Sequence, residues 1–118
     1  MNNLRNKVQL IGNLGADPEV KSTTKGKKFV NFSMATTEAY RNSSGELVKE
    51  TEWHRVVAWG KNADIIEQYV VKGSEIAIEG KLNHRSYEDE AGKTRVYTQV
   101  IAFAVLLIKT PRSTEKVA

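Results

Sequence analysis

The chain of 118 residues has the length of one domain, and its 40% hydrophobic and 27% charged residues are typical of a soluble globular protein rather than a disordered one. It contains no cysteine, which excludes disulfides, thiolate nucleophiles and cysteine-held zinc. The net charge of +4 favours polyanionic partners, although 14 acidic residues dilute the positive field.

No stretch of the sequence has the character of a targeting or membrane segment. The longest apolar run covers residues 100–108, well short of the roughly 20 residues that a helix needs to cross a bilayer. Near the N-terminus, Gln9, Gly12 and Asn13 interrupt the apolar run that a secretory signal requires. We therefore expect a cytoplasmic protein with no membrane partner.

Apolar and polar residues alternate along much of the chain, which predicts β-strands joined by hairpins. In the second strand Val30, Phe32 and Met34 share one face. The polar segment over residues 41–50 predicts a long hairpin tip between the second and third strands. The expected strands cover residues 7–14, 28–39, 51–60, 75–87 and 94–108.

The apolar spacing changes to that of a helix between the third and fourth strands. A helix over residues 62–72 is expected to end at Lys72 and Gly73, because a cation in the last turn followed by glycine commonly closes a helix. One side of this helix carries four apolar side chains, Ala63, Ile66, Tyr69 and Val70.

The fourth strand is expected to bury Ile76, Ile78 and Leu82. Gly80 inside it indicates a bend or a close approach of another backbone. A charged turn over residues 88–93 then leads into the last strand.

Three strands, a helix and two further strands, with long hairpins, form the layout of an OB-fold. This fold is an all-β, five-stranded Greek-key barrel that binds oligonucleotides or oligosaccharides. We predict such a domain over residues 1–110 and a short polar C-terminal end over residues 111–118. The fold alone does not decide the function.

The third strand carries two tryptophans on one face. Alternation places Trp53, Arg55, Val57 and Trp59 on one side and Glu52, His54, Val56 and Ala58 on the other. The second set is more compact and is the better candidate to line a barrel, so the tryptophans are expected to face outward. The alternative that both tryptophans fill the core stays open, because most tryptophans are largely buried.

Two tyrosines mark the hairpins on either side of that strand. Tyr40 and Tyr87 lie where the second and fourth strands run into hairpin tips, each beside charged residues. Exposed rings near cations suit nucleobases, since stacking contributes about 1 to 3 kcal/mol per base. The sequence therefore predicts a stacking surface made of Tyr40, Trp53, Trp59 and Tyr87.

Cationic side chains near these rings are candidates to contact phosphates. Arg55 stands out because an arginine framed by two tryptophans can both stack and neutralise phosphate. For at least half of the others, the alternative is an ordinary solvated surface charge. The other candidates are Lys7, Arg41, Lys49, Lys61, Lys72, Lys81 and Arg85, with Lys25, Lys27 and Lys28 on the first hairpin loop.

Several long segments together resemble the bacterial single-stranded DNA-binding protein family over roughly residues 5–108. The matching segments are NKVQLIGNLGADPEV at 6–20, ATTEAYR at 35–41, TEWHRVVAWGKNA at 51–63 and KGSEIAIEGKL at 72–82. The resemblance implies a DNA-binding protein of replication, recombination and repair, associated with the bacterial nucleoid, with little sequence specificity.

The resemblance also implies roles for individual residues. It assigns base stacking to the four aromatic residues, with tyrosine at positions 40 and 87 where some relatives have tryptophan. It implies a homo-oligomer, usually a tetramer, with Val8, Leu10 and His54 at subunit contacts. Many relatives continue into a flexible linker and an acidic tip that recruits other enzymes. Residues 113–118, STEKVA, show no such segment, so recruitment by that route cannot be carried over to this chain. Both a shortened chain and a naturally short family member stay open.

Other functions receive less support from the sequence. His54 and His84 lie on different expected strands without metal-ligand spacing, so we expect no catalytic residues, no metal and no cofactor. A related OB module, such as a dimeric primosome accessory protein, stays open, although the four aromatic residues argue against it. An RNA-binding barrel also stays open, because stacking and phosphate contacts do not exclude ribose.

Overall fold

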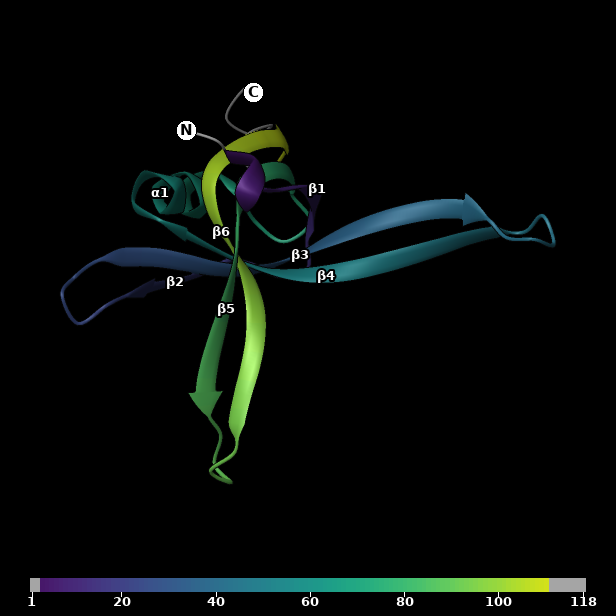
Figure 1. Cartoon of the computed structure of the whole chain (residues 1–118). Helices are drawn as coiled ribbons and strands as arrows, with labels where there is room; N and C mark the ends of the chain where they lie inside the picture. The colour runs from purple at the N-terminus through teal and green to yellow at the C-terminus, as the bar shows by residue number, and fades with distance from the viewer. Residues whose placement is uncertain (1–2, 111–118) are drawn as a thin grey trace, which may run out of the picture.

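All five expected strands are present, and a sixth strand joins them. The computed structural model describes residues 3–110, and these residues form six strands, one α-helix and a short 3-10 helix (Figure 1). In chain order the elements are η1 (Asn3–Arg5), β1 (Val8–Leu14), β2 (Glu19–Ser22), β3 (Lys28–Arg41), β4 (Leu47–Trp59), α1 (Gly60–Tyr69), β5 (Glu75–Glu88) and β6 (Thr94–Lys109).

The strands close into the predicted OB-type barrel. Their order in the sheet is β1-β5-β6-β4-β3-β2, and β1 also pairs with β3, so five strands form a closed ring with β2 at its outside edge. β4 and β6 run parallel, with Val56 opposite Val100, whereas every other described pairing is antiparallel. The predicted fold class is therefore confirmed.

Two hairpins extend beyond the barrel as two-stranded arms (Figure 1). β3 and β4 stay paired as far as Arg41 opposite Leu47, and β5 and β6 as far as Glu88 opposite Thr94. We call residues 36–52 the β3–β4 arm and residues 83–99 the β5–β6 arm. Most side chains of both arms are exposed, because the arms lack a second layer to pack against.

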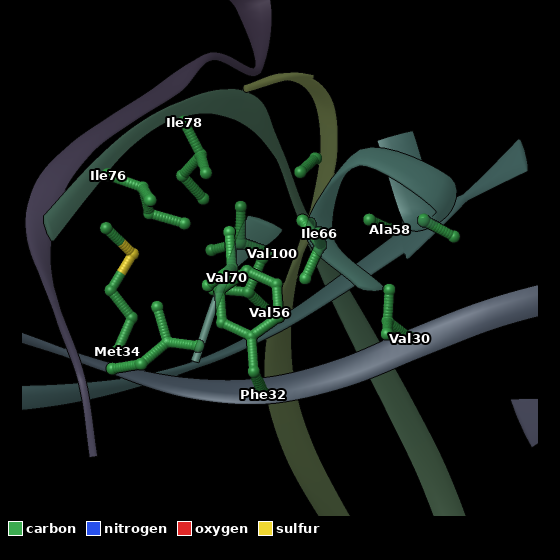
Figure 2. Packing of buried hydrophobic residues seen from close by; sticks show 13 residues of the cluster. Val30, Phe32, Met34, Val56, Ala58, Ile66, Val70, Ile76, Ile78 and Val100 are labelled. Atoms are coloured by element: carbon green, nitrogen blue, oxygen red, sulfur yellow. The ribbon is translucent and has the colours of Figure 1, made fainter. Parts of the chain in front are cut away.

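The core fills the barrel and is closed by the helix. Val30, Phe32 and Met34 of β3 are buried, as their shared face predicts, and Ile66 of α1 packs among them (Figure 2). The other labelled members of the cluster are Val56, Ala58, Val70, Ile76, Ile78 and Val100.

The prediction for Leu82 is wrong, because its side chain is 44% exposed. β5 shifts its register with β6 between Glu79 and Gly80, and from there the strand leaves the barrel toward the arm. The expected close approach at Gly80 is confirmed: a Cβ at this position would lie 2.2 Å from the carbonyl oxygen of Ile101. The strand thus bends where the absence of a side chain allows it.

Local boundaries also differ from the sequence predictions. α1 begins at Gly60 and ends at Tyr69, earlier than the predicted span of 62–72, and Gly73, with φ of 88°, belongs to the turn that follows. β4 begins at Leu47, so the hairpin tip is shorter than the predicted residues 41–50. Strand β2 was not predicted, because all four of its side chains are exposed and carry no apolar alternation.

The predicted polar end over residues 111–118 lies outside the described residues. Within residues 3–110, no helix is long and apolar enough to span a membrane.

Candidate nucleic-acid interface

The outer face of β4 carries the predicted aromatic set. Val56 and Ala58 are fully buried in the barrel, whereas Trp53 is 61% exposed and Arg55 is also exposed. Trp59, at the end of the strand, is half-buried. The interpretation that the compact set lines the barrel is therefore confirmed, and the alternative in which both tryptophans fill the core is wrong.

The indole of Trp53 lies against the bend after β1. A Cβ added to Gly15 would come within 2.5 Å of Cζ3 of Trp53. The backbone N–H of Gly15 donates to the carbonyl oxygen of Ser33 over 3.2 Å, which holds the bend against β3. Gly15 therefore leaves the space in which the Trp53 ring lies, and one face of the ring is supported while the rest meets solvent.

Gly15→Ala is expected to push the Trp53 ring toward solvent. Because the atom in the way belongs to a side chain that can turn outward, we expect a loss of folding stability of only about 1 kcal/mol. In a Trp59→Phe background, where Trp53 is the one indole, its fluorescence emission should shift to the red. Ala16→Ser, at the exposed neighbouring position, should leave the emission unchanged. Unshifted emission in the Gly15→Ala variant would contradict this placement of the ring.

Trp59 forms a second aromatic position with Phe29 of β3. The two ring centroids lie 4.7 Å apart, with an interplanar angle of 31°. Beside Trp59 lies a shallow hollow of about 470 Å³, lined also by Lys25 and Lys27 of the β2–β3 turn. Two of the three cations predicted on this loop therefore lie near a predicted stacking ring.

The third lysine of this group, Lys28, has a different environment. Its Nζ donates to Oδ1 of Asp64 over 2.9 Å and also to a carboxylate oxygen of Glu67, both on α1. The hydrogen bonds to Glu67 and Asp64 raise the pKa of the Lys28 ammonium above its ordinary value. Lys28 thus ties β3 to the helix, and its charge is already matched by two carboxylates.

The β5–β6 arm contributes Tyr87 and a ring that the sequence analysis missed. Tyr87 is 51% exposed, and its ring centroid lies 5.7 Å from that of Tyr97 on β6. The Cζ atom of Arg55 lies 4.7 Å from the centroid of the Tyr97 ring, within the range of a cation–π contact. Tyr97 therefore contacts groups from both β4 and β5.

Tyr40 lies apart from this cluster. It is on the β3–β4 arm, opposite Val48, and is 46% exposed. Its hydroxyl donates to Oε1 of Glu50 over 3.1 Å. The structure thus places the four predicted stacking rings at separate points along the barrel face and the two arms.

An open groove of about 770 Å³ lies on the barrel face, and of the four predicted rings Trp59 lines it whereas Tyr40, Trp53 and Tyr87 do not. Of the predicted residues, Trp59, Arg55 and Arg85 line it. Tyr97, Phe29 and Lys21 also line the groove although they were not predicted to belong to a site. Lys21 was missed together with its strand, β2.

The charges in the groove favour an anionic ligand. Among the described residues, Arg55 and Arg85 have no carboxylate within ion-pair distance. Two acidic residues, Asp17 and Glu19, line the groove. Oε2 of Glu19 lies 3.6 Å from Nζ of Lys21. Oδ1 of Asp17 accepts the backbone N–H of Lys72 over 2.8 Å. Both carboxylates therefore already have partners, whereas the two arginines have no carboxylate partner among the described residues.

The other predicted phosphate contacts do not line the groove. Nζ of Lys7 lies 3.4 Å from Oε2 of Glu79, and Arg41 donates to the carbonyl oxygen of Gly45 over 2.9 Å. The remaining four are distributed over the β3–β4 arm, α1, the turn before β5, and β5: Lys49, Lys61, Lys72 and Lys81.

The residues predicted at subunit contacts lie on β4 and on β1. His54 is half-buried, and its Nε2 lies 2.9 Å from Oγ1 of Thr36. Val8 and Leu10 are half-buried and pack against the core. The exposed side chains of β1 are instead Gln9, Ile11 and Asn13. Within residues 3–110, no three histidine or carboxylate side chains gather into a group that could hold a metal ion.

Known proteins share both the sequence and this architecture. The chain is 50% identical over 97 residues to the single-stranded DNA-binding protein 1 of Chlorobaculum tepidum, covering 81% of this chain and 60% of that protein. It is 46% identical over 98 residues to the single-stranded DNA-binding protein of Rickettsia typhi, covering 81% of this chain and 64% of that protein. The chain thus spans less than two thirds of the length of these relatives.

Solved structures of single-stranded DNA-binding proteins are also similar to this chain. The Plasmodium falciparum SSB in complex with single-stranded DNA is similar with a TM-score of 0.80 and 31% identity, covering 92% of this chain and 100% of that one. A deletion mutant of the single-stranded DNA binding protein from Thermus aquaticus is similar with a TM-score of 0.77 and 30% identity, covering 88% of this chain and 50% of that one. The model of the single-strand binding protein family matches residues 5–108. Because the family model covers nearly all of the described barrel and both arms, the chain belongs to the single-strand binding protein family.

Proposed function

We propose that this chain binds single-stranded DNA with little sequence specificity and without catalysis. The observation that carries the proposal is the groove that two arginines without carboxylate partners, Arg55 and Arg85, line together with the rings of Phe29, Trp59 and Tyr97. A surface of this kind offers charge to the phosphates and π-faces to the bases, and every base has a π-face. The single-stranded DNA bound to the Plasmodium falciparum relative supports the same ligand.

The mechanism begins with electrostatic capture. The net charge of +4 attracts the strand. Arg55 and Arg85 then hold phosphates in the groove, while bases stack on Trp59 and on the exposed face of Trp53. Since stacking does not read the edges of the bases, little sequence preference is expected.

The arms extend the surface beyond the groove. On the β3–β4 arm, Tyr40 shares a face with Glu50, whereas Arg41 and Lys49, which lies opposite Ala39, are on the other face of the ladder. Tyr87 plays the equivalent part on the β5–β6 arm. We propose that a long strand continues from the groove onto these arms, and that Lys7, Lys61, Lys72 and Lys81 add weaker phosphate contacts around the barrel. Lys7 contributes least, because Glu79 offsets its charge.

The site and its relatives also support a cellular role and an assembly. We propose that the protein acts in replication, recombination and repair in the cytoplasm, as a homo-oligomer that is most simply a tetramer. An exposed apolar row supports self-association: Ile11 of β1 lies opposite Ala77 of β5, which lies opposite Leu106 of β6. Light scattering should give the mass of the oligomer, and a stable dimer would favour the accessory-protein alternative.

A fluorescence titration tests the proposed function. Oligo(dT) should quench the tryptophan emission, and the affinity should fall as salt rises, because bound phosphates displace counterions. A titration with neither quenching nor salt dependence would refute the binding mechanism. Tighter binding of oligo(U) than of oligo(dT) would overturn the preference for DNA. Incubation with DNA and Mg²⁺ should leave the strand uncut and unjoined, and a new product would contradict the absence of catalysis.

A further inference from the structure

The β3–β4 arm and the β5–β6 arm separate at a fork on the barrel (Figure 1). β4 and β6 pair in parallel at three positions, of which Val56 opposite Val100 is the one nearest the arms. Beyond that pair each strand follows its own antiparallel partner, β3 or β5. No described backbone pairing therefore links the two arms past the fork.

A side-chain contact spans this fork. Arg55 lies one residue before Val56 on β4, and Tyr97 lies three residues before Val100 on β6. The Arg55 guanidinium carbon is 4.7 Å from the Tyr97 ring centroid, and both side chains line the groove. The contact joins the two strands just beyond the point where their ladder ends.

Tyr97 also fixes the ring of Tyr87. The two rings are tilted by 57° at a centroid distance of 5.7 Å, which is a favourable arrangement of two aromatic rings. In the ladder Tyr97 faces Arg85, and Tyr87 faces Arg95. A row of Arg55, Tyr97 and Tyr87 thus runs from the outer face of β4 onto the β5–β6 arm.

A ring is a suitable support for a phosphate-binding arginine. A carboxylate partner would neutralise the guanidinium and occupy its N–H donors, whereas an aromatic face restricts the side chain without using those donors. Among the described residues Arg55 has no ion pair, so its charge stays directed at the groove. Tyr97 is half-buried, and its ring contacts the ring of Tyr87.

We propose that Tyr97 is a positioning residue of the strand-binding surface. Its ring holds the Arg55 guanidinium at the fork, where the charge meets a backbone phosphate, and holds Tyr87 in line with it. This inference rests on the proposed function, since it concerns how the same surface binds a strand. Tyr97 is thus a fifth ring of this surface, and it acts through its neighbours Arg55 and Tyr87.

The test compares five variants with the unmodified chain in a titration of fluorescein-labelled oligo(dT), followed by anisotropy at several salt concentrations. Tyr97→Leu should weaken binding about five- to tenfold, because it removes both a cation–π contact and a ring–ring contact. Tyr97→Phe keeps the ring and should bind within about twofold of the unmodified chain. Arg55→Met should lower the slope of log K against log salt by about 0.7, the value for one phosphate on a single strand.

Two measurements distinguish a positioning role of Tyr97 from a merely structural one: the salt dependence of the affinity, and the affinity of a double variant that combines Tyr97→Leu with Arg55→Met. Tyr97→Leu should lower the slope of log K against log salt as Arg55→Met does. When Arg55 is already replaced by Met, adding Tyr97→Leu should weaken binding by clearly less than it does in the unmodified chain. Val96→Ala, at the exposed neighbouring position on β6, is the matched control and should change neither affinity nor slope. Urea unfolding of each variant establishes that the barrel is intact.

A measurement without DNA tests the contact itself. The ring current of Tyr97 should move the Arg55 Hδ proton resonances upfield, and the shift should disappear in Tyr97→Leu and persist in Tyr97→Phe. The proposal is overturned if Tyr97→Leu binds like the unmodified chain, if its effect adds fully to that of Arg55→Met, or if its salt slope is unchanged. Failure of the unmodified chain to bind oligo(dT) would instead refute the proposed function, and this inference with it.

Discussion

Trp53→Ala should weaken the binding of oligo(dT) by about 1 to 3 kcal/mol, the contribution of one stacked base. The fold should remain intact, because the indole is 61% exposed and does not belong to the core cluster. Anisotropy with a labelled oligonucleotide gives the affinity, and urea unfolding followed by circular dichroism gives the stability. Neither measurement relies on the emission of the residue that has been removed.

The corresponding change at Trp59 should affect stability as well as binding. Trp59 is half-buried and packs on Phe29 at a centroid distance of 4.7 Å, so Trp59→Ala should lower both the affinity and the free energy of unfolding. Trp53→Phe keeps a π-face and should recover much of the binding lost in Trp53→Ala. If Trp53→Ala unfolded the protein, or left the affinity unchanged, the stacking role of this ring would be refuted.

Ile66→Ala should lower the free energy of unfolding by about 2 to 5 kcal/mol, which is the usual range for truncating a fully buried isoleucine. Ile66 is the larger of the two fully buried side chains of α1, and it packs among residues of β3 and β4 in the core cluster (Figure 2). The helix contacts β3, β4 and β6, so the surrounding strands cannot easily move inward to fill the space. Urea unfolding of the purified variant measures the effect.

Leu47→Ala is the control for this core substitution. Leu47 is exposed at the start of β4, on the β3–β4 arm, so removing a similar volume there should change stability by no more than about 0.5 kcal/mol. Equal losses in the two variants would show that α1 does not close the core. An Ile66→Ala variant that still folds at low temperature should retain measurable binding of oligo(dT), because the residue does not line the groove.

Alternation in the sequence correctly predicted which face of β4 lines the barrel and which carries the tryptophans. The choice between the two sides depended on size: small Val56 and Ala58 fit inside a narrow barrel, whereas Trp53 and Arg55 do not. The same reasoning placed Val30, Phe32 and Met34 in the core. Binary patterns work in β3 and β4 because one face of the barrel part of each strand packs on a single core and most side chains of the other face do not.

The same patterns failed where a strand leaves the core or never enters it. Leu82 continues the apolar alternation of β5, yet the strand bends away at Gly80 before reaching it. β2 pairs with β3 through its backbone while all of its side chains are exposed, so it has no apolar signal. The pairing of Lys28 with α1 likewise depends on where the helix packs.

The sequence by itself determined the barrel class, the outward face of β4 and the exposure of Tyr40 and Tyr87, because each follows from local alternation and from polar hairpin tips. Only the tertiary structure decided which of those groups share a groove. Tyr97 stands between Val96 and Thr98 with nothing in the sequence to mark it, and its contact with Arg55 exists because β4 and β6 meet in parallel at Val56 and Val100. A parallel contact between strands distant in the chain leaves no trace in local periodicity.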